Sequence, residues 1–280
     1  MIKRIITSGC SFSDYSTDFT WNNVFENYLK EKNLNITFDH RGLSSQGQQL
    51  IQKKTIHAIY KAFKEGLKPE EICVFVMWSA HNRRSWYIDN NDVVNDIIDY
   101  FANRRESKTS FQLQFGDLEN KAEKFAYIGD PINKAPPNYY IPYNKEGGWY
   151  INGHKFDEVN FFKEYFMFSN QLDSIIMSLE NILMLQSFCK SYNIKLYEQF
   201  ILSNIWEEVE SLKTHKEVAH LYNLIDKNNF VSLIGMHDYL KNIGQKYITT
   251  TLHPNAEGHK FWFDNVLLPY IHNKGLNYGQ

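Results

Sequence analysis

The feature of this sequence that most constrains its fold is an unbroken apolar run, Ile72–Trp78. The run follows the acidic Glu71 and ends at the polar segment Ser79–Arg84. Seven apolar residues in a row predict a β-strand with both faces buried, because a strand with one face in water alternates apolar and polar residues. Helices on both sides of a parallel sheet bury a strand in this way. The run therefore predicts the centre of such a sheet.

Strand and helix patterns alternate around this run. Apolar, β-branched clusters predict further strands over Ile2–Thr7, Ile36–Phe38 and Ile194–Phe200. Apolar residues at helical spacing predict helices over Trp21–Leu29, Leu50–Phe63, Gln171–Tyr192 and Ala256–Ile271. This alternation predicts an α/β fold with helices on both faces of a parallel sheet. Ligands of such folds bind at the carboxyl ends of the strands.

Residues from about 85 to 157 interrupt the alternation. Gly, Pro, Tyr and Asn are dense in the second half of this stretch, as in Ala135–Tyr140. We expect an irregular insertion or cap on a single domain spanning residues 1–280, since long irregular stretches in compact proteins serve as lids or binding surfaces. An aromatic cluster in this stretch fits either a carbohydrate-contacting lid or a small satellite core: Tyr139, Tyr140, Tyr143, Trp149 and Tyr150.

The charge balance argues against nucleic-acid and membrane partners. The formal net charge is −2 and no polybasic run is present. No apolar stretch approaches the ~20 residues that span a bilayer. The N-terminal apolar segment is too short for a signal peptide, and the three scattered cysteines do not form a disulfide framework. We therefore expect a cytoplasmic protein. The sequence leaves its oligomeric state open.

No metal or cofactor is expected. His215 and His220 are five residues apart, so they do not share a helix face as the pair in a zinc helix does. His253 and His259 flank a turn, but no cysteine or carboxylate cluster joins them in sequence.

A serine and a histidine at opposite ends of the chain suggest hydrolytic chemistry. Ser11 lies in a turn of small residues directly after the first predicted strand, where Gly9 permits a sharp bend. His253 precedes the last predicted helix. A serine hydroxyl attacks an acyl carbon only when a base is within hydrogen-bond reach, about 2.6–3.2 Å away. The alternatives are that Ser11 only caps a helix or that the neighbouring Cys10 reacts. Ser13 can also be the cap while Ser11 reacts, and for Cys10 we favour an inert, inward-pointing thiol.

Two motifs resemble those of the SGNH hydrolases, the GDSL-type lipases and esterases. Residues 9–13 (Gly-Cys-Ser-Phe-Ser) resemble the first block of that family, with Cys10 in place of its usual Asp. Residues 253–259 (His-Pro-Asn-Ala-Glu-Gly-His) are similar to its last block, which carries the catalytic histidine first. The resemblance covers about residues 1–84 and 170–272. It implies a flavodoxin-like three-layer α/β/α sandwich with a five-stranded parallel sheet, and hydrolysis of a small acyl ester through an acyl-enzyme.

The resemblance assigns Ser11 as nucleophile and His253 as base, acting on a small-molecule or carbohydrate ester such as an O-acetyl group. In the second block, the amide of Ser45 or Gly47 takes the place of an oxyanion-hole donor. After the third strand, Asn82 is the first stand-in for the family's oxyanion asparagine, and His81 is the second. Two further residues are candidates for substrate binding. Trp78 can stack on a sugar or pack at the strand end, and Arg83 can hold an anion or lie solvated.

The acid of the family's triad is missing from its usual place. Thr250 occupies the position three residues before His253. Such an acid orients the imidazole and stabilises its charged form, and a threonine carries no charge for the second task. Three outcomes remain: a Ser11–His253 dyad, a substitute carboxylate such as Asp238, or a site that binds without catalysis. Residues 78–83 (Trp-Ser-Ala-His-Asn-Arg) also resemble a divergent branch associated with bacteriophage and environmental sequences. The alternative function is therefore a non-catalytic binding module on the same fold, such as a virus-encoded (phage) structural or accessory protein.

Overall fold

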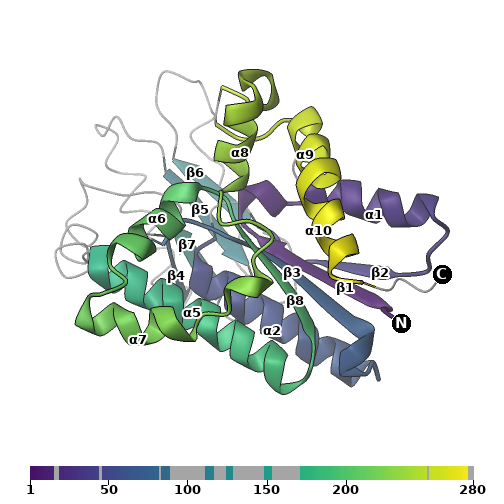
Figure 1. Ribbon diagram of the computed structural model, residues 1–280, viewed down its shortest axis with the longest axis horizontal. Coiled ribbons are helices and arrows are strands. Elements are labelled where there is room, and N and C mark those ends of the chain that lie inside the picture. The colour runs from purple at the N-terminus through teal and green to yellow at the C-terminus, as the bar shows by residue number, and fades with distance from the viewer. Residues whose placement is uncertain are drawn as a thin grey trace.

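A parallel sheet of four described strands, in the order β2-β1-β3-β8, forms the centre of the protein (Figure 1). Its strands are β1 (Arg4–Gly9), β2 (Thr37–His40), β3 (Ile72–Trp78) and β8 (Lys195–Phe200). The computed structural model describes residues 1–15, 19–43, 46–81, 83–88, 111–116, 124–128, 148–152, 171–250 and 252–276.

The apolar run in β3 is buried along its whole length, between β1 and β8. Arg4–Gly9 of β1 pair in register with Ile72–Met77 of β3. The prediction of a central, doubly covered strand is confirmed, since helices lie on both faces of this sheet (Figure 1).

The helices form two layers around the sheet. Helices α1 (Trp21–Glu31), α9 (Ala256–Trp262) and α10 (Leu268–Asn273) cover one face, and α2 (Gln48–Lys64) and α5 (Gln171–Ser191) cover the other (Figure 1). A π-helical turn, Phe263–Leu267, connects α9 to α10. The remaining helices are α6 (Ser203–Ser211), α7 (Lys216–Leu224) and α8 (Met236–Ile243). This layering is a coarse match to the flavodoxin-like arrangement.

Helix packing follows from the apolar faces that the sequence predicts. In α1, Phe25 packs edge-on against Phe75 of β3, with ring centroids 5.1 Å apart. Trp21 packs against Trp262 of α9, with centroids 6.1 Å apart. The start of α1 is fixed by a capping box, in which the side chain of Asn23 accepts from the amide of Thr20 at 3.0 Å. Aromatic contacts thus join α1 to α9 and to β3.

A fifth parallel strand is not found among the described residues, contrary to expectation. Beside β8, only Phe230 forms a bridge, to Glu198. The side chain of Gln199 explains why pairing stops there. Its Oε1 accepts from the amide of Ser232 at 3.0 Å, and its Nε2 donates to the carbonyl of Ile234 at 2.6 Å. A side-chain amide therefore takes the backbone groups that a longer strand would have paired.

The stretch expected to be an irregular insertion contains four strands in a separate antiparallel sheet, in the order β4-β7-β5-β6. They are β4 (Arg84–Ile88), β5 (Phe111–Gly116), β6 (Lys124–Ile128) and β7 (Gly148–Asn152). The segment therefore has regular structure that its composition did not predict. The side chains of the aromatic cluster lie outside the described residues.

The three cysteines, Cys10, Cys73 and Cys189, are free and buried. Burial raises the pKa of the Cys73 and Cys189 thiols well above the usual range, so both stay protonated. Among the helices that the structure describes, none has the length and apolar character needed to cross a membrane.

Candidate active site

The loops after β1 and β3 leave the sheet at the same edge. The chain runs from β1 outward to β2 and then returns to β3 on the other side of β1. This reversal of strand order is the switch point where ligands bind in open α/β sheets. Ser11 lies there, at the start of a 3₁₀ turn (Ser11–Ser13) that follows β1 directly.

Close packing of Ser13 holds this turn against the sheet. The side chain of Ser13 is fully buried, and its Oγ accepts from Nε1 of Trp21 at 2.9 Å. Its carbonyl accepts from Nδ2 of Asn22 at 3.0 Å. A Cβ atom added to Gly42 would lie 1.8 Å from the same carbonyl oxygen, so the loop after β2 approaches as closely as glycine allows. Ser13 therefore fixes the turn against α1 and against the loop after β2.

The side chains of Cys10 and Ser11 point in different directions. Cys10 belongs to the hydrophobic core and is fully buried, as expected for an inert thiol. Ser11 is partly exposed. Because it is the first residue of the turn, its amide has no acceptor within the turn and can donate to a bound group.

His253 lies against Ser11 although 242 positions separate them in sequence. The distance between Ser11 Oγ and His253 Nε2 is 2.8 Å, within the range expected for a nucleophile and its base. The two residues that the sequence pairs are thus in direct contact.

A tight loop fixes the backbone of His253. The carbonyl of His253 accepts from the amide of Thr249 at 2.7 Å, and its own amide donates to Thr249 Oγ1 at 3.2 Å. Pro254 forms an antiparallel bridge with Ile248. On the ring side, Phe12 packs against the imidazole, with centroids 5.2 Å apart. Backbone bonds and an aromatic contact therefore restrict the imidazole.

Neither candidate for the missing acid contacts His253. Thr250 is exposed in the turn, and it is the neighbouring Thr249 that bonds to His253. Asp238 accepts from the amide of Ser203 at 2.6 Å and lies 3.0 Å from Nδ1 of His237. These hydrogen bonds outweigh burial and hold the pKa of Asp238 below its usual value. No hydrogen bond among the described residues joins either side chain to His253.

His259 is a structural residue. It is buried, and its Nδ1 accepts from the amide of Trp21 at 3.2 Å, which ties α9 to the start of α1. Burial lowers its pKa to about 3, so the ring is neutral at physiological pH. The described residues include no group of three or more His, Cys, Asp or Glu side chains that could hold a metal ion.

The oxyanion-hole candidates are placed only in part. Ser45 and Asn82 lie outside the described residues. Gly47 is buried at the N-cap of α2. Its carbonyl accepts from the amides of Leu50 and Ile51, both at 3.1 Å. The first turn of α2 therefore fixes the backbone at Gly47.

The expectation that Trp78 contacts substrate is wrong. Trp78 is fully buried, and its Nε1 donates to Oε1 of Glu198 at 2.9 Å. A side chain without exposed surface cannot stack on a sugar ring. Arg83 is partly buried, and within the described part of the chain its Nη1 is a buried atom without a hydrogen-bond partner. Arg83 therefore remains a candidate for holding an anion.

His81 contacts a carboxyl group, which the sequence did not predict. Its Nε2 lies 2.7 Å from Oε2 of Glu208 on α6. Glu208 also accepts from Nε2 of Gln171, at 2.9 Å. This arrangement connects the loop after β3 to α5 and α6. The contact engages Nε2, one of the two ring nitrogens of His81.

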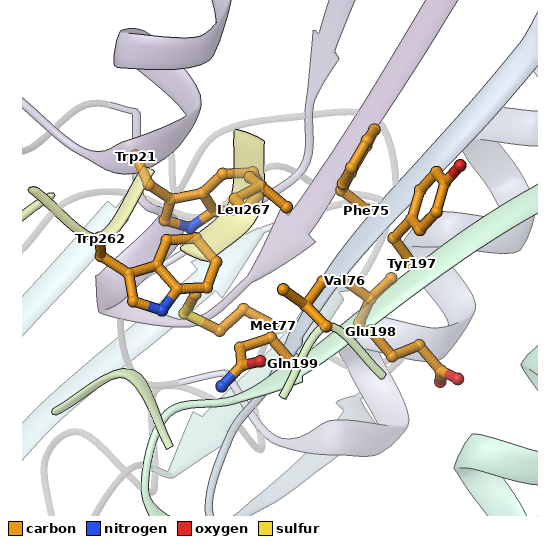
Figure 2. A pocket seen from close by; sticks show the side chains of 10 residues that line it. Trp21, Phe75, Val76, Met77, Tyr197, Glu198, Gln199, Trp262 and Leu267 are labelled. Atoms are coloured by element: carbon orange, nitrogen blue, oxygen red, sulfur yellow. The ribbon is translucent and has the colours of Figure 1, made fainter. Parts of the chain in front are cut away.

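A small cavity lies beneath the site, between the sheet and the α9 layer (Figure 2). Its volume is about 10 Å³, enough for one water molecule at most. The indoles of Trp21 and Trp262 lie next to each other at one side, and the carboxyl group of Glu198 points away from them (Figure 2). Neither Ser11 nor His253 lines this cavity, which is therefore a packing defect in the core.

Sequence reasoning missed the residues that hold Ser11 and His253 in place: Trp21, Asn22, Thr249 and Phe12. The contacts of Trp21 and Asn22 with Ser13 span 8 and 9 positions, with no periodic pattern to mark them. The one local signal was the Thr249–Thr251 run before His253, whose first hydroxyl bonds to the His253 amide.

No family model matches the sequence, and neither the curated proteins nor the solved structures contain a significant match.

Proposed function

We propose that this protein is a serine ester hydrolase of the SGNH type. The observation that carries the proposal is the 2.8 Å contact between Ser11 Oγ and His253 Nε2 at the carboxyl edge of the sheet. A partly exposed serine at the end of a strand, hydrogen-bonded to a distant histidine, is the arrangement that activates a weak nucleophile.

The reaction would proceed in two steps. Ser11 Oγ attacks the acyl carbon while His253 Nε2 takes the hydroxyl proton, and the alcohol leaves with that proton as the acyl-enzyme forms. Water then attacks the acyl-enzyme, His253 takes a proton from the water, and Ser11 regains its proton as the carboxylic acid leaves. The Ser11 amide, with Ser45 or Gly47 and Asn82 as further donors, would stabilise the oxyanion in both steps.

Neither of the two candidates for the acid completes a triad with Ser11 and His253. Thr250 and Asp238 do not contact His253, so neither carboxylate nor hydroxyl from these positions orients the ring. Thr249 and Phe12 restrict the position of His253, but they supply no charge to stabilise imidazolium. None of these four side chains supplies the negative charge that stabilises imidazolium in a complete triad.

The substrate would be a small acyl ester, with a carbohydrate O-acetyl group as one candidate. The partly buried guanidinium of Arg83, with its unpartnered Nη1 in the described part of the chain, favours an ester that also bears a negative charge. The resemblance to the SGNH family supports the ester chemistry and does not select the acyl group.

The second candidate is a non-catalytic binding module, such as a phage structural or accessory protein. The observation that favours it is the exposed Thr250 at the expected position of the acid. A former active site that only binds its ligand has no need for a charged partner on His253.

Hydrolysis of a short-chain aryl ester distinguishes these candidates. We expect turnover by the wild-type protein and loss of at least about a hundredfold in Ser11→Ala and His253→Ala, because each change removes one member of the dyad. Matched controls are Ser191→Ala and His272→Ala, two exposed residues of the same types at the ends of α5 and α10. Equal background rates in wild type and Ser11→Ala would favour the binding module.

A further inference from the structure

A second histidine, His40, connects to the turn that carries Ser11. His40 is the last residue of β2. Its Nδ1 lies 2.9 Å from Oγ1 of the fully buried Thr7 in β1 and 3.2 Å from Nδ2 of Asn22 in α1. Its Nε2 lies 3.1 Å from Oε2 of Glu26, also in α1. Three polar side chains thus surround the imidazole.

The contacts of Asn22 determine which nitrogen of His40 carries the proton. Asn22 Nδ2 donates to the carbonyl of Ser13 at 3.0 Å, and a carbonyl can only accept. The second hydrogen of this NH₂ group faces His40 Nδ1 at 3.2 Å and Thr7 Oγ1 at 3.5 Å, so the nearer His40 Nδ1 is assigned as its acceptor. Nε2 then carries the proton and donates to Glu26. This assignment makes His40 neutral, with Nδ1 as the acceptor and Nε2 as the donor.

Charged and titratable groups face His40 from every neighbouring element. On α1, Glu26 contacts the ring and is itself paired with Lys30 at 2.8 Å. Asp39 precedes His40 in β2 and is paired with Arg41. The ring of Tyr15 stacks on the imidazole, with centroids 4.2 Å apart. Burial lowers the pKa of His40 more than the carboxylates of Glu26 and Asp39 raise it, which agrees with the neutral form.

Protonation of His40 would disturb the bond that Asn22 makes to Ser13. A proton on Nδ1 can be donated to Thr7 Oγ1, the nearer partner, but it leaves the NH₂ group of Asn22 facing a donor in place of an acceptor. We expect Asn22 to move away from the charged ring, which would weaken its bond to the Ser13 carbonyl. Ser13 is the third residue of the turn that begins with Ser11. The nucleophile is therefore connected to His40 through one side chain, Asn22.

We propose that neutral His40 is a positioning residue for Ser11, and that its protonation in mild acid loosens the nucleophile turn. This inference rests on the proposed hydrolase function. It adds a second proton to the acid side of the pH profile, because both His253 and His40 must be neutral for the reaction.

Two variants separate the contacts of the ring. His40→Asn places an amide oxygen near the position of Nδ1, where it can still accept from Asn22 and Thr7, and it cannot be protonated. His40→Gln instead directs its amide toward Glu26 and loses the acceptor for Asn22. A matched control is His272→Asn, which changes an exposed histidine on α10.

The first measurement is the pH dependence of kcat/KM for aryl ester hydrolysis. In wild type and His272→Asn, we expect the acid limb to steepen toward a hundredfold loss per pH unit, about tenfold for each of two protons. In His40→Asn, the limb should be shallower than in wild type by about tenfold per pH unit, because one proton no longer contributes. His40→Gln should have a lower kcat than His40→Asn at neutral pH. An unchanged acid limb in His40→Asn would overturn the inference.

The second measurement uses only the wild-type protein, so it requires neither ester hydrolysis nor the folding of a variant. In the wild-type protein, the indole N–H resonance of Trp21 reports on its bond to Ser13 Oγ, and the ring nitrogen shifts of His40 report its protonation. We expect both signals to titrate together, with the Nε2–H tautomer at neutral pH. A Trp21 resonance that stays fixed while His40 titrates would contradict the inference. If no ester is hydrolysed at any pH, the proposed function fails, and this titration alone decides whether His40 controls the turn.

Discussion

The indole N–H of Trp78 donates a hydrogen bond of 2.9 Å to the carboxyl group of Glu198, on the neighbouring strand at the centre of the sheet. Glu198 is fully buried and also accepts from Nε2 of Gln186 in α5, at 2.6 Å. Burial raises the pKa of Glu198 to about 8, against the lowering effect of these two donors. The group is therefore protonated in the folded protein over a range in which it is ionised in the unfolded chain.

This difference predicts a loss of stability as pH rises. Glu198 in the unfolded chain has a pKa near 4.5, so its contribution to folding is complete below that value and is lost as pH rises through about 8. Within this window we expect the free energy of unfolding to fall by about 1 kcal/mol per pH unit. Urea unfolding of wild type and Glu198→Gln between pH 5 and about 8.5 measures the slope. The same slope in both proteins would rule out Glu198 as its source.

Leu252 adopts a left-handed backbone conformation with φ of 62°, directly before His253. Its side chain is 63% exposed, so little packing compensates for the strain. A leucine in this conformation costs about 1–2 kcal/mol, which asparagine largely avoids. We expect Leu252→Asn to raise the free energy of unfolding by about 1 kcal/mol, measured by urea unfolding. Leu224→Asn is the control, because Leu224 is similarly exposed at 67% and its φ is not positive. An equal gain in the control would show that the backbone at Leu252 is not the cause.

Gly42 lies against the backbone of Ser13. Because an added Cβ atom would lie 1.8 Å from the Ser13 carbonyl oxygen, Gly42→Ala must displace the nucleophile turn or the loop after β2. We expect a loss of about 1–3 kcal/mol in stability and a larger loss in esterase activity than in folded protein. Circular dichroism and the hydrolysis rate of the folded fraction measure the two effects. Gly244→Ala should be neutral, since the nearest atom to its added Cβ is 3.9 Å away in the flexible side chain of Lys246. Full activity in Gly42→Ala would show that the close approach does not position Ser11.

Arg83 is the residue we expect to select for charge on the substrate. If its guanidinium binds an anionic group, Arg83→Gln should raise KM for a carboxylate-bearing ester by about 10–100-fold, the range of a hydrogen bond to a charged group. KM for a neutral aryl ester should change little. Steady-state kinetics with the two esters, and with Lys241→Gln on α8 as a charge-matched control, test this. Equal changes in KM for both esters would assign Arg83 a structural role.

The local patterns of the sequence predicted much of the parallel sheet and the contact between Ser11 and His253. The apolar run Ile72–Trp78 and the turn after Gly9 depend on neighbours in sequence, and the structure has both as expected. The contact between Ser11 and His253 followed from motif order and from the rule that strand ends meet at one edge.

The predictions failed where side chains compete with the backbone. The side chain of Gln199 binds the amide of Ser232 and the carbonyl of Ile234. No sequence pattern predicts that these two hydrogen bonds end the strand pairing beside β8. Trp78 was a substrate candidate because it ends a strand, but its bond to Glu198 spans 120 positions and turns it inward. Asn22 and His40 were missed for the same reason, since Asn22 contacts Ser13 and His40 contacts Thr7 only in the folded protein.

Reaction with a fluorophosphonate probe tests most directly whether Ser11 and His253 form a working nucleophile and base. The probe forms a stable bond only with an activated hydroxyl, and mass spectrometry of the digested protein locates the adduct. We predict one adduct, on the peptide that contains Ser11, absent from Ser11→Ala and strongly reduced in His253→Ala. A wild-type protein that carries no adduct, or an adduct that persists in Ser11→Ala, would contradict the assignment of Ser11 as the nucleophile.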